Sequence, residues 1–180
     1  MNYIYTIVLV ILASSHSVAE DFISQESAAN TYNYVSNYEI AINSPPGLVW
    51  KNLENLKSWM HAFELSHHSG KKGDVGEILR LYPNQQFYIQ VTGKVENKLL
   101  TIANLPSSFN GEESTGVGVI SLMPRGSETL VQLVMSRRYE WIGQGENTMK
   151  VKRESKEFQG STRQMWGNFL NRLKELSEKT

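Results

Sequence analysis

The chain has 180 residues, 40% of them hydrophobic and 20% charged, which indicates one soluble domain and excludes a disordered chain or a multi-span membrane protein. Its 18 Lys and Arg residues offset its 18 Asp and Glu residues, so no overall basic charge is present to hold a nucleic-acid backbone. The absence of cysteine excludes disulfides, thiol nucleophiles and thiolate metal sites.

The first 19 residues are expected to form a secretory signal peptide. Residues 3–13 are an uncharged apolar run, shorter than the roughly 20 residues of a membrane-spanning helix. Ser17 and Ala19 supply the small residues of a peptidase site, so cleavage would leave Glu20 first. An uncleaved anchor and a buried N-terminal strand are the alternatives, because no Lys or Arg precedes the apolar run. No Asn-x-Ser/Thr sequon follows, which favours a periplasmic or secreted protein outside a glycosylating pathway.

The mature chain is expected to begin with a polar lead-in and then to form a single domain. Residues 20–33 lack sustained periodicity, and the domain is assigned to residues 34–180. Alternating apolar residues over 34–42 predict a strand. Two prolines end it, and apolar residues at helical spacing then predict a short helix to about Leu56 and a second helical turn through Phe63.

The middle of the chain predicts an antiparallel sheet. Its separators, which include the polar residues 107–114, are turn-like and too short for parallel crossovers, so consecutive strands should be neighbours. Five short β-rich segments lie at residues 77–82, 86–95, 99–105, 116–123 and 129–141.

The last segment, residues 155–179, predicts a long amphipathic helix, because it contains no proline and carries apolar residues every three or four positions. The order of strand, short helices, meander and long helix predicts an α+β fold. In such a fold the helix covers one face of the sheet.

Local sequence motifs resemble the START/Bet v 1-like (SRPBCC) superfamily, particularly its polyketide-cyclase-like and Hsp90-activator-like bacterial members. Residues 38–50, YEIAINSPPGLVW, are similar to the opening strand and proline-started helix, although Gly47 stands where an acidic residue often begins that helix. Further similar pieces, within a resemblance covering roughly residues 34–176, are Leu56 with Trp59, Gly73-x-x-Gly76-Glu77 and Trp166-x-x-x-Leu170-x-x-Leu173.

The resemblance implies a helix-grip fold, in which a curved antiparallel sheet wraps around the C-terminal helix and leaves a cavity between them. Members of this superfamily bind lipids, cyclise polyketides, carry ligands or assist chaperones on one scaffold, so the fold alone does not identify the reaction or the ligand.

Candidate ligand-binding residues are those expected to face such a cavity. The inward register of the last strand continues from apolar positions to Arg137 and Tyr139, which could orient a polar head. The alternative for the apolar residues is that they fill the core, and the alternative for Arg137 is that it is solvated or paired with a carboxylate. The candidates are Phe87, Ile89, Met135, Arg137, Tyr139, Phe158, Met165, Trp166 and Phe169.

The sequence does not predict a metal, a cofactor or a catalytic residue. His61, Glu64, His67 and His68 lie close together, but their spacing does not converge on a metal ion, so a solvated polar connection is expected. The G-x-S-x-G, G-x-x-x-x-G-K-[ST] and G-x-G-x-x-G patterns are absent.

A basic cluster precedes the long helix. Interleaved glutamates favour a solvated loop, with weak contact to anionic lipid headgroups as the alternative. The cluster consists of Lys150, Lys152, Arg153 and Lys156.

The leading functional hypothesis is an exported protein that binds or carries an apolar or amphipathic, lipid-like small molecule. The enzyme alternative is a metal-independent cyclase- or isomerase-like reaction in the same cavity. The third class is an interaction module like the Hsp90 activators, which export would separate from that cytosolic chaperone.

Overall fold

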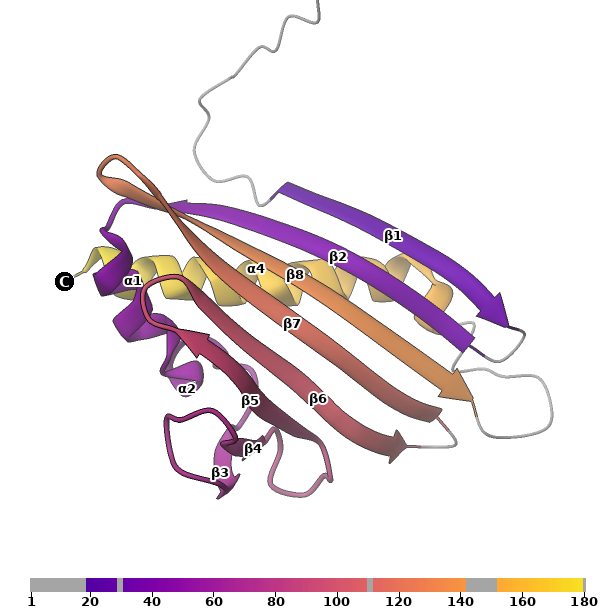
Figure 1. Ribbon diagram of the computed structural model, residues 1–180. Coiled ribbons are helices and arrows are strands. Elements are labelled where there is room, and N and C mark those ends of the chain that lie inside the picture. Colours follow the sequence, from indigo (N-terminus) through magenta and orange to yellow (C-terminus); the bar gives the residue numbers. More distant parts are fainter. Residues whose placement is uncertain (1–18, 29–30, 110–111, 142–151, 180) are drawn as a thin grey trace, which may run out of the picture.

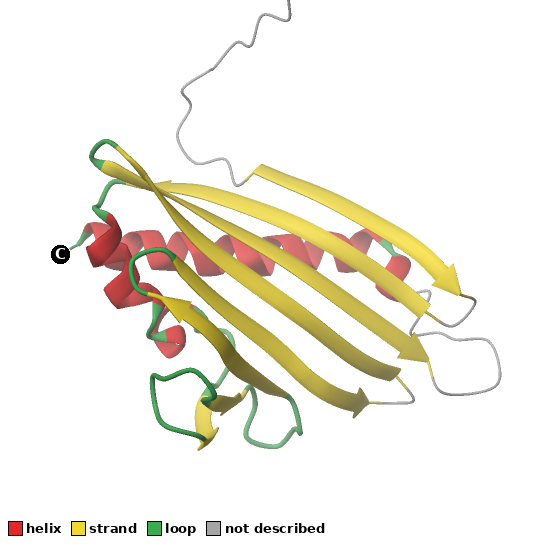
Figure 2. Cartoon of the chain, viewed as in Figure 1, coloured by secondary structure: helices red, strands yellow, loops and turns green. Residues whose placement is uncertain are grey.

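The computed structural model describes residues 19–28, 31–109, 112–141 and 152–179. It contains an eight-stranded antiparallel sheet in the order β1-β2-β8-β7-β6-β5-β4-β3, with a long C-terminal helix along one face (Figure 1, Figure 2). The elements are β1 Ala19–Ala28, β2 Thr31–Ile42, α1 Pro46–Leu53, α2 Leu56–Trp59, β3 Ser66–Ser69, β4 Ile78–Arg80, β5 Tyr88–Val95, β6 Leu99–Phe109, β7 Glu112–Arg125, β8 Glu128–Trp141 and α4 Lys156–Glu178. The predicted α+β fold is therefore confirmed.

Tight turns connect the central strands, as their short separators predicted. The turn between β5 and β6 places Asn97 at φ 59°, and the turn between β7 and β8 places Gly126 at φ 63°. Glycine and asparagine are the residues that adopt this left-handed conformation most readily. Strands β5 to β8 therefore follow one another antiparallel, and β8, the last strand of the chain, then pairs with β2, an early one.

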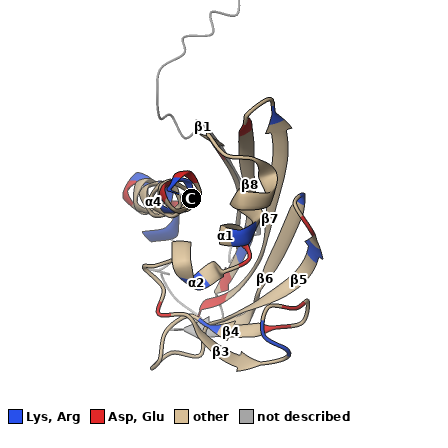
Figure 3. Cartoon of the chain, turned by 90° about the vertical axis from the view of Figure 1, so that its left-hand side faces the viewer, with Lys and Arg blue, Asp and Glu red and all other residues tan. Residues whose placement is uncertain are grey.

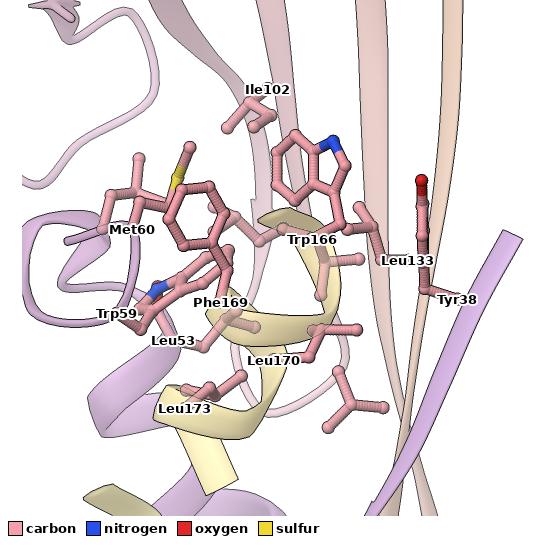
Figure 4. Close-up of a cluster of buried hydrophobic side chains, with 14 of the residues drawn as sticks. Tyr38, Leu53, Trp59, Met60, Ile102, Leu133, Trp166, Phe169, Leu170 and Leu173 are labelled. Carbon is pink, nitrogen blue, oxygen red and sulfur yellow. The ribbon is translucent and has the colours of Figure 1, made fainter. Parts of the chain in front are cut away.

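The core lies between the sheet and the C-terminal half of α4. Even-numbered positions of β2 and odd-numbered positions of β8 are directed inward, in the period of two expected for strands. In Figure 3, α4 is seen nearly end-on to one side of the sheet, with α1 and α2 beside it. Figure 4 shows Phe169 of α4 among Leu53, Trp59 and Met60, and Trp166 beside Leu133 of β8.

Both ends of α4 are attached to the rest of the domain. At the C-terminal end, Ser44 Oγ donates a hydrogen bond to the Ser177 carbonyl at 2.6 Å. Near the N-terminal end, Gln159 Nε2 donates to the Tyr32 hydroxyl of β2 at 3.2 Å. The hydroxyl of Ser155 caps the first turn by accepting from the Phe158 N–H at 3.1 Å. The helix is thus attached to the rest of the domain near both of its ends.

The polar segment expected to be an irregular lead-in instead contains an edge strand. β1 pairs with β2 from Ala19 opposite Glu39 to Ala28 opposite Thr31, and β2 itself begins three residues before the predicted Tyr34. Backbone hydrogen bonds form this pairing, so it does not need an apolar period in β1. The apolar run and Ser17 of the expected signal peptide lie outside the described residues.

Two other segments expected as connections are also strands. β6 and β7 extend through most of residues 107–114, with Ser107 opposite Ser114, after a register shift that begins at Asn104. Residues 66–69 form β3, which pairs with β4. Neither segment carries an apolar alternation, and pairing with a neighbouring strand is what makes each extended.

Among the described residues, no helix combines the length and the apolar character required to cross a bilayer.

Candidate functional site

A cavity of about 340 Å³ lies under the N-terminal half of α4, at the opposite end of the helix from the packed core. This volume is within the range of small-molecule sites in proteins, roughly 300–1,000 Å³. The apolar part of its wall consists of Phe63, Leu81, Tyr82, Phe87, Phe158 and Met165. The charged and aromatic polar part consists of Tyr34, Glu112, Arg137, Tyr139 and Arg153, and the remaining lining residues are Asn104, Ser107, Ser114, Ser161 and Thr162.

The two parts of the wall come from different strands of the sheet. Most of the apolar side chains belong to the segment around β4 and β5, where Phe63 and Tyr82 meet edge to face at 5.8 Å. The charged side chains belong to β7, β8 and the residues just before α4, and β6 separates the two sides. The cavity is therefore amphipathic.

Arg153 is fixed at the polar end by an ion pair and by two aromatic rings. Its Nε donates to Glu112 Oε2 at 3.1 Å and its Nη2 donates to Glu112 Oε1 at 2.9 Å, a two-point contact with a carboxylate that is 4% exposed. Its guanidinium carbon lies 4.5 Å from the ring centres of both Tyr139 and Phe158. Such a contact neutralises the buried carboxylate and joins the start of α4 to the start of β7.

Arg137 lies beside this pair without a carboxylate partner among the described residues. It stands on β8 opposite Gly116 of β7, and a Cβ atom at Gly116 would lie 2.9 Å from Arg137 Cγ, so the missing side chain makes room for it. The Nε atom of Arg137 is shielded from solvent and has no hydrogen-bond partner. Its guanidinium carbon is 5.6 Å from the ring centre of Tyr139.

Tyr34 is a neutral hydrogen-bonding group at physiological pH. Burial raises the pKa of Tyr34 above its ordinary value, and the adjacent Tyr139, whose ring stacks on Tyr34 at 6.0 Å, raises it further. Burial lowers the pKa of Arg137, but interactions with Tyr139, Tyr34 and Glu112 outweigh that effect, so its pKa is raised overall. The polar end thus presents phenol hydroxyls next to a permanent positive charge.

Five of the nine predicted ligand-binding residues line the cavity: Phe87, Arg137, Tyr139, Phe158 and Met165. The other four, Ile89, Met135, Trp166 and Phe169, are not among the lining residues and lie in the packed core. Phe169 is fully buried, with its ring 5.4 Å from Trp166 and 6.4 Å from Trp59. The helical stripe predicted one continuous inward face, but its C-terminal part packs tightly and only its N-terminal part borders a void.

Glu112 and Tyr34 were not predicted as cavity residues. Glu112 falls in a stretch read as a turn, yet extending the inward alternation of β7 backwards from Ile120 places Glu112 on the same face. The same period on β2 places Tyr34 inward.

One member of the expected basic surface cluster, Arg153, is not at the surface. Arg153 is engaged by Glu112 inside the cavity, so it is not a solvated or lipid-facing cation. Lys152 and Lys156 are exposed, and Lys150 lies outside the described residues. Arg153 differs from the prediction because its partner, Glu112, lies 41 positions away in the sequence, and counting charges in a local segment does not reveal it.

The three histidines of the polar connection have separate neighbours. His61 Nδ1 lies 3.1 Å from the Trp59 carbonyl oxygen, His67 Nδ1 lies 3.1 Å from Glu77 Oε1, and the His68 ring lies 4.7 Å from that of Tyr88. Within the part of the chain that the structure describes, no three His, Asp or Glu side chains are grouped as a metal site requires.

Comparison with known proteins identifies the fold. No family model and no curated protein matches the chain. Among solved structures, a Nitrosospira multiformis protein aligns with a TM-score of 0.58 at 19% identity, covering 78% of this chain and 94% of its own. A Chromobacterium violaceum protein aligns with a TM-score of 0.54 at 14% identity, covering 80% and 96%.

Ara h 8.0201, a Bet v 1 homologue, aligns with a TM-score of 0.56 at 10% identity, covering 82% of this chain and 99% of its own. At these identities the likeness concerns the fold and does not extend to ligand or reaction. With its antiparallel sheet and long C-terminal helix, this chain therefore has the Bet v 1-like (START/SRPBCC) helix-grip fold that its sequence motifs resemble.

Proposed function

We propose that this protein binds and carries an apolar or amphipathic small molecule in the cavity under the N-terminal half of α4. The observation that carries the proposal is the void itself, about 340 Å³, with an apolar wall on one side and polar groups on the other. Bet v 1-like folds typically bind hydrophobic ligands, and the position of this void between sheet and helix is consistent with that use.

The cavity volume limits the size of the enclosed part of the ligand. At about 340 Å³ the space lies near the lower end of the range for small-molecule sites, roughly 300–1,000 Å³. A short alkyl chain or a small ring system with one polar group matches this capacity.

Carriage is favoured over a cyclase- or isomerase-like reaction by the state of the polar groups. A metal-free reaction of that kind needs a general base that can reach the substrate. Among the described lining residues the single carboxylate is Glu112, which Arg153 engages at two points, and no histidine lines the cavity.

We also propose that the protein is exported, with cleavage after Ala19. Cleavage there would keep β1 almost entire, because its pairing with β2 continues from Glu20 opposite Tyr38. N-terminal sequencing of the protein recovered from outside the cytosol should begin at Glu20, within a residue or two. Recovery of the intact chain from the cytosol would reject export and return the Hsp90-activator-like hypothesis.

The carrier proposal is tested by filling the cavity. Met165 borders the void and is only partly buried, so Met165→Trp should occupy the space and weaken binding of the neutral fluorescent probe N-phenyl-1-naphthylamine about tenfold or more. Gln164→Trp adds the same ring to an exposed position of α4 and should leave binding unchanged.

Native mass spectrometry of protein purified from its own compartment would then give the mass of a retained ligand. An unmodified protein that binds neither the probe nor any retained molecule would refute the proposal.

A further inference from the structure

We propose that the ligand is a carboxylate-bearing amphiphile whose head is bound by Arg137. This inference rests on the proposed carrier function and specifies the chemistry of its ligand. It starts from the charges at the polar end of the cavity.

The polar end carries one positive charge that no described carboxylate balances. Two guanidinium groups, those of Arg137 and Arg153, face one carboxylate, that of Glu112. Both oxygens of Glu112 accept hydrogen bonds from Arg153, so the carboxylate is already committed. Arg137 is partly buried, and a guanidinium in such a site without a carboxylate partner is energetically costly, so an anion placed beside it lowers that cost.

The geometry around Arg137 favours an anion that enters the cavity. Its Nε atom has no hydrogen-bond partner, its side chain occupies the space beside Gly116, and Arg137 is among the residues that line the cavity. Guanidinium groups bind carboxylates through two parallel hydrogen bonds, for which an unused Nε–H is one of the usual donors. The phenol side chains of Tyr34 and Tyr139 adjoin the same group and line the same cavity.

The charge balance and the apolar wall define the rest of the ligand. One uncompensated positive charge matches a monoanion, which favours a carboxylate over a phosphate monoester with its charge of about −1.5 to −2. An amine-headed ligand would meet two guanidinium groups and be repelled. The ring of Phe87 and the side chain of Met165 line the same cavity, so an alkyl or ring portion attached to the head would be buried there.

The test compares three ligands of equal chain length that differ only in the head: decanoate, 1-decanol and decylamine. Each is titrated against the full chain at pH 7.5 by displacement of N-phenyl-1-naphthylamine. Decanoate should bind tightest, by about tenfold or more over decanol, which is the usual contribution of hydrogen bonds to a charged group. Decylamine should bind weakest.

Substitutions on β8 assign the preference to Arg137. Arg137→Gln should weaken decanoate binding about tenfold to a hundredfold and leave decanol binding within about threefold, because only the anion uses the guanidinium. Arg137→Lys keeps the charge but loses the planar pair of N–H donors, so it should give an intermediate affinity for decanoate. Arg138→Gln is the matched control, since Arg138 is the next residue, faces solvent and pairs with Glu140.

Equal binding of decanoate and decanol by the unmodified protein would overturn the inference while leaving the carrier function intact. An equal loss of decanoate binding in the Arg137→Gln and Arg138→Gln variants would also overturn it. Failure of all three ligands and of the probe to bind would instead refute the carrier function. The comparison of ligands on the unmodified protein decides the question even where a variant does not fold.

Discussion

Removal of the Phe169 ring measures whether α4 packs on a solid core or on a void at that position. Phe169 is fully buried, and its ring lies 5.1 Å from Phe63, 5.4 Å from Trp166 and 6.4 Å from Trp59. All three contacts are edge-to-face, the arrangement that aromatic pairs prefer. The ring therefore contributes both buried area and specific contacts.

We expect Phe169→Ala to lower the free energy of unfolding by about 3–5 kcal/mol, the usual cost of deleting a packed aromatic ring. Since domains are stable by only about 5–15 kcal/mol in total, this change should shift the unfolding midpoint strongly. Binding of the neutral probe should change little where the variant remains folded, because Phe169 is not among the residues that line the cavity.

Met165→Ala is the matched comparison, one helical turn earlier on the same helix. Met165 is partly buried and borders a space that is already open, so its removal enlarges the cavity and loses few packed contacts. We expect a loss of about 1 kcal/mol, comparable to one or two buried methylene groups, together with a clear change in probe affinity.

Urea unfolding followed by circular dichroism, with probe titration of the same preparations, measures both quantities. A cost below about 1.5 kcal/mol for Phe169→Ala, accompanied by a large change in probe binding, would contradict the division of α4 into a packed half and a cavity half.

Three further predictions follow from the described contacts. Arg153→Ala leaves the Glu112 carboxylate buried and unpaired and should destabilise the protein by about 3 kcal/mol, whereas adding Glu112→Gln should restore part of the loss. Urea unfolding of the single and double variants checks this, and effects of the two substitutions that simply add would contradict the pairing. Because the pKa of Tyr34 is raised in the folded state, the unfolded chain loses that proton first as pH rises past about 10, so stability should fall there by up to ~1.4 kcal/mol per pH unit. Tyr34→Phe should reduce this slope between pH 9 and 11 in thermal unfolding, and an unchanged slope would show that other groups cause the loss. Treatment with EDTA should leave the melting temperature unchanged, since no metal-binding group is found among the described residues; a fall that zinc reverses would reveal a structural metal.

Periodicity and spacing in the sequence were sufficient to predict most of the architecture. An alternating pattern identified the central strands, short separators made them antiparallel neighbours, and a three-four apolar repeat identified α4. The inward positions of Arg137 and Tyr139 also followed from the alternation along β8, because the two faces of a strand are determined by counting residues. These features depend on residues that are close in the sequence, so sequence patterns were sufficient to predict them.

The tertiary structure decided where packing ends and the cavity begins. Phe169 and Met165 belong to one stripe of one helix, and only the placement of Trp59 and Phe63 against the helix makes the first of them core. The pairing of Arg153 with Glu112 and the attachment of β1 to β2 likewise depend on contacts that residue type does not encode. A void and a long-range ion pair are properties of several elements positioned together, and a sequence pattern describes each element separately.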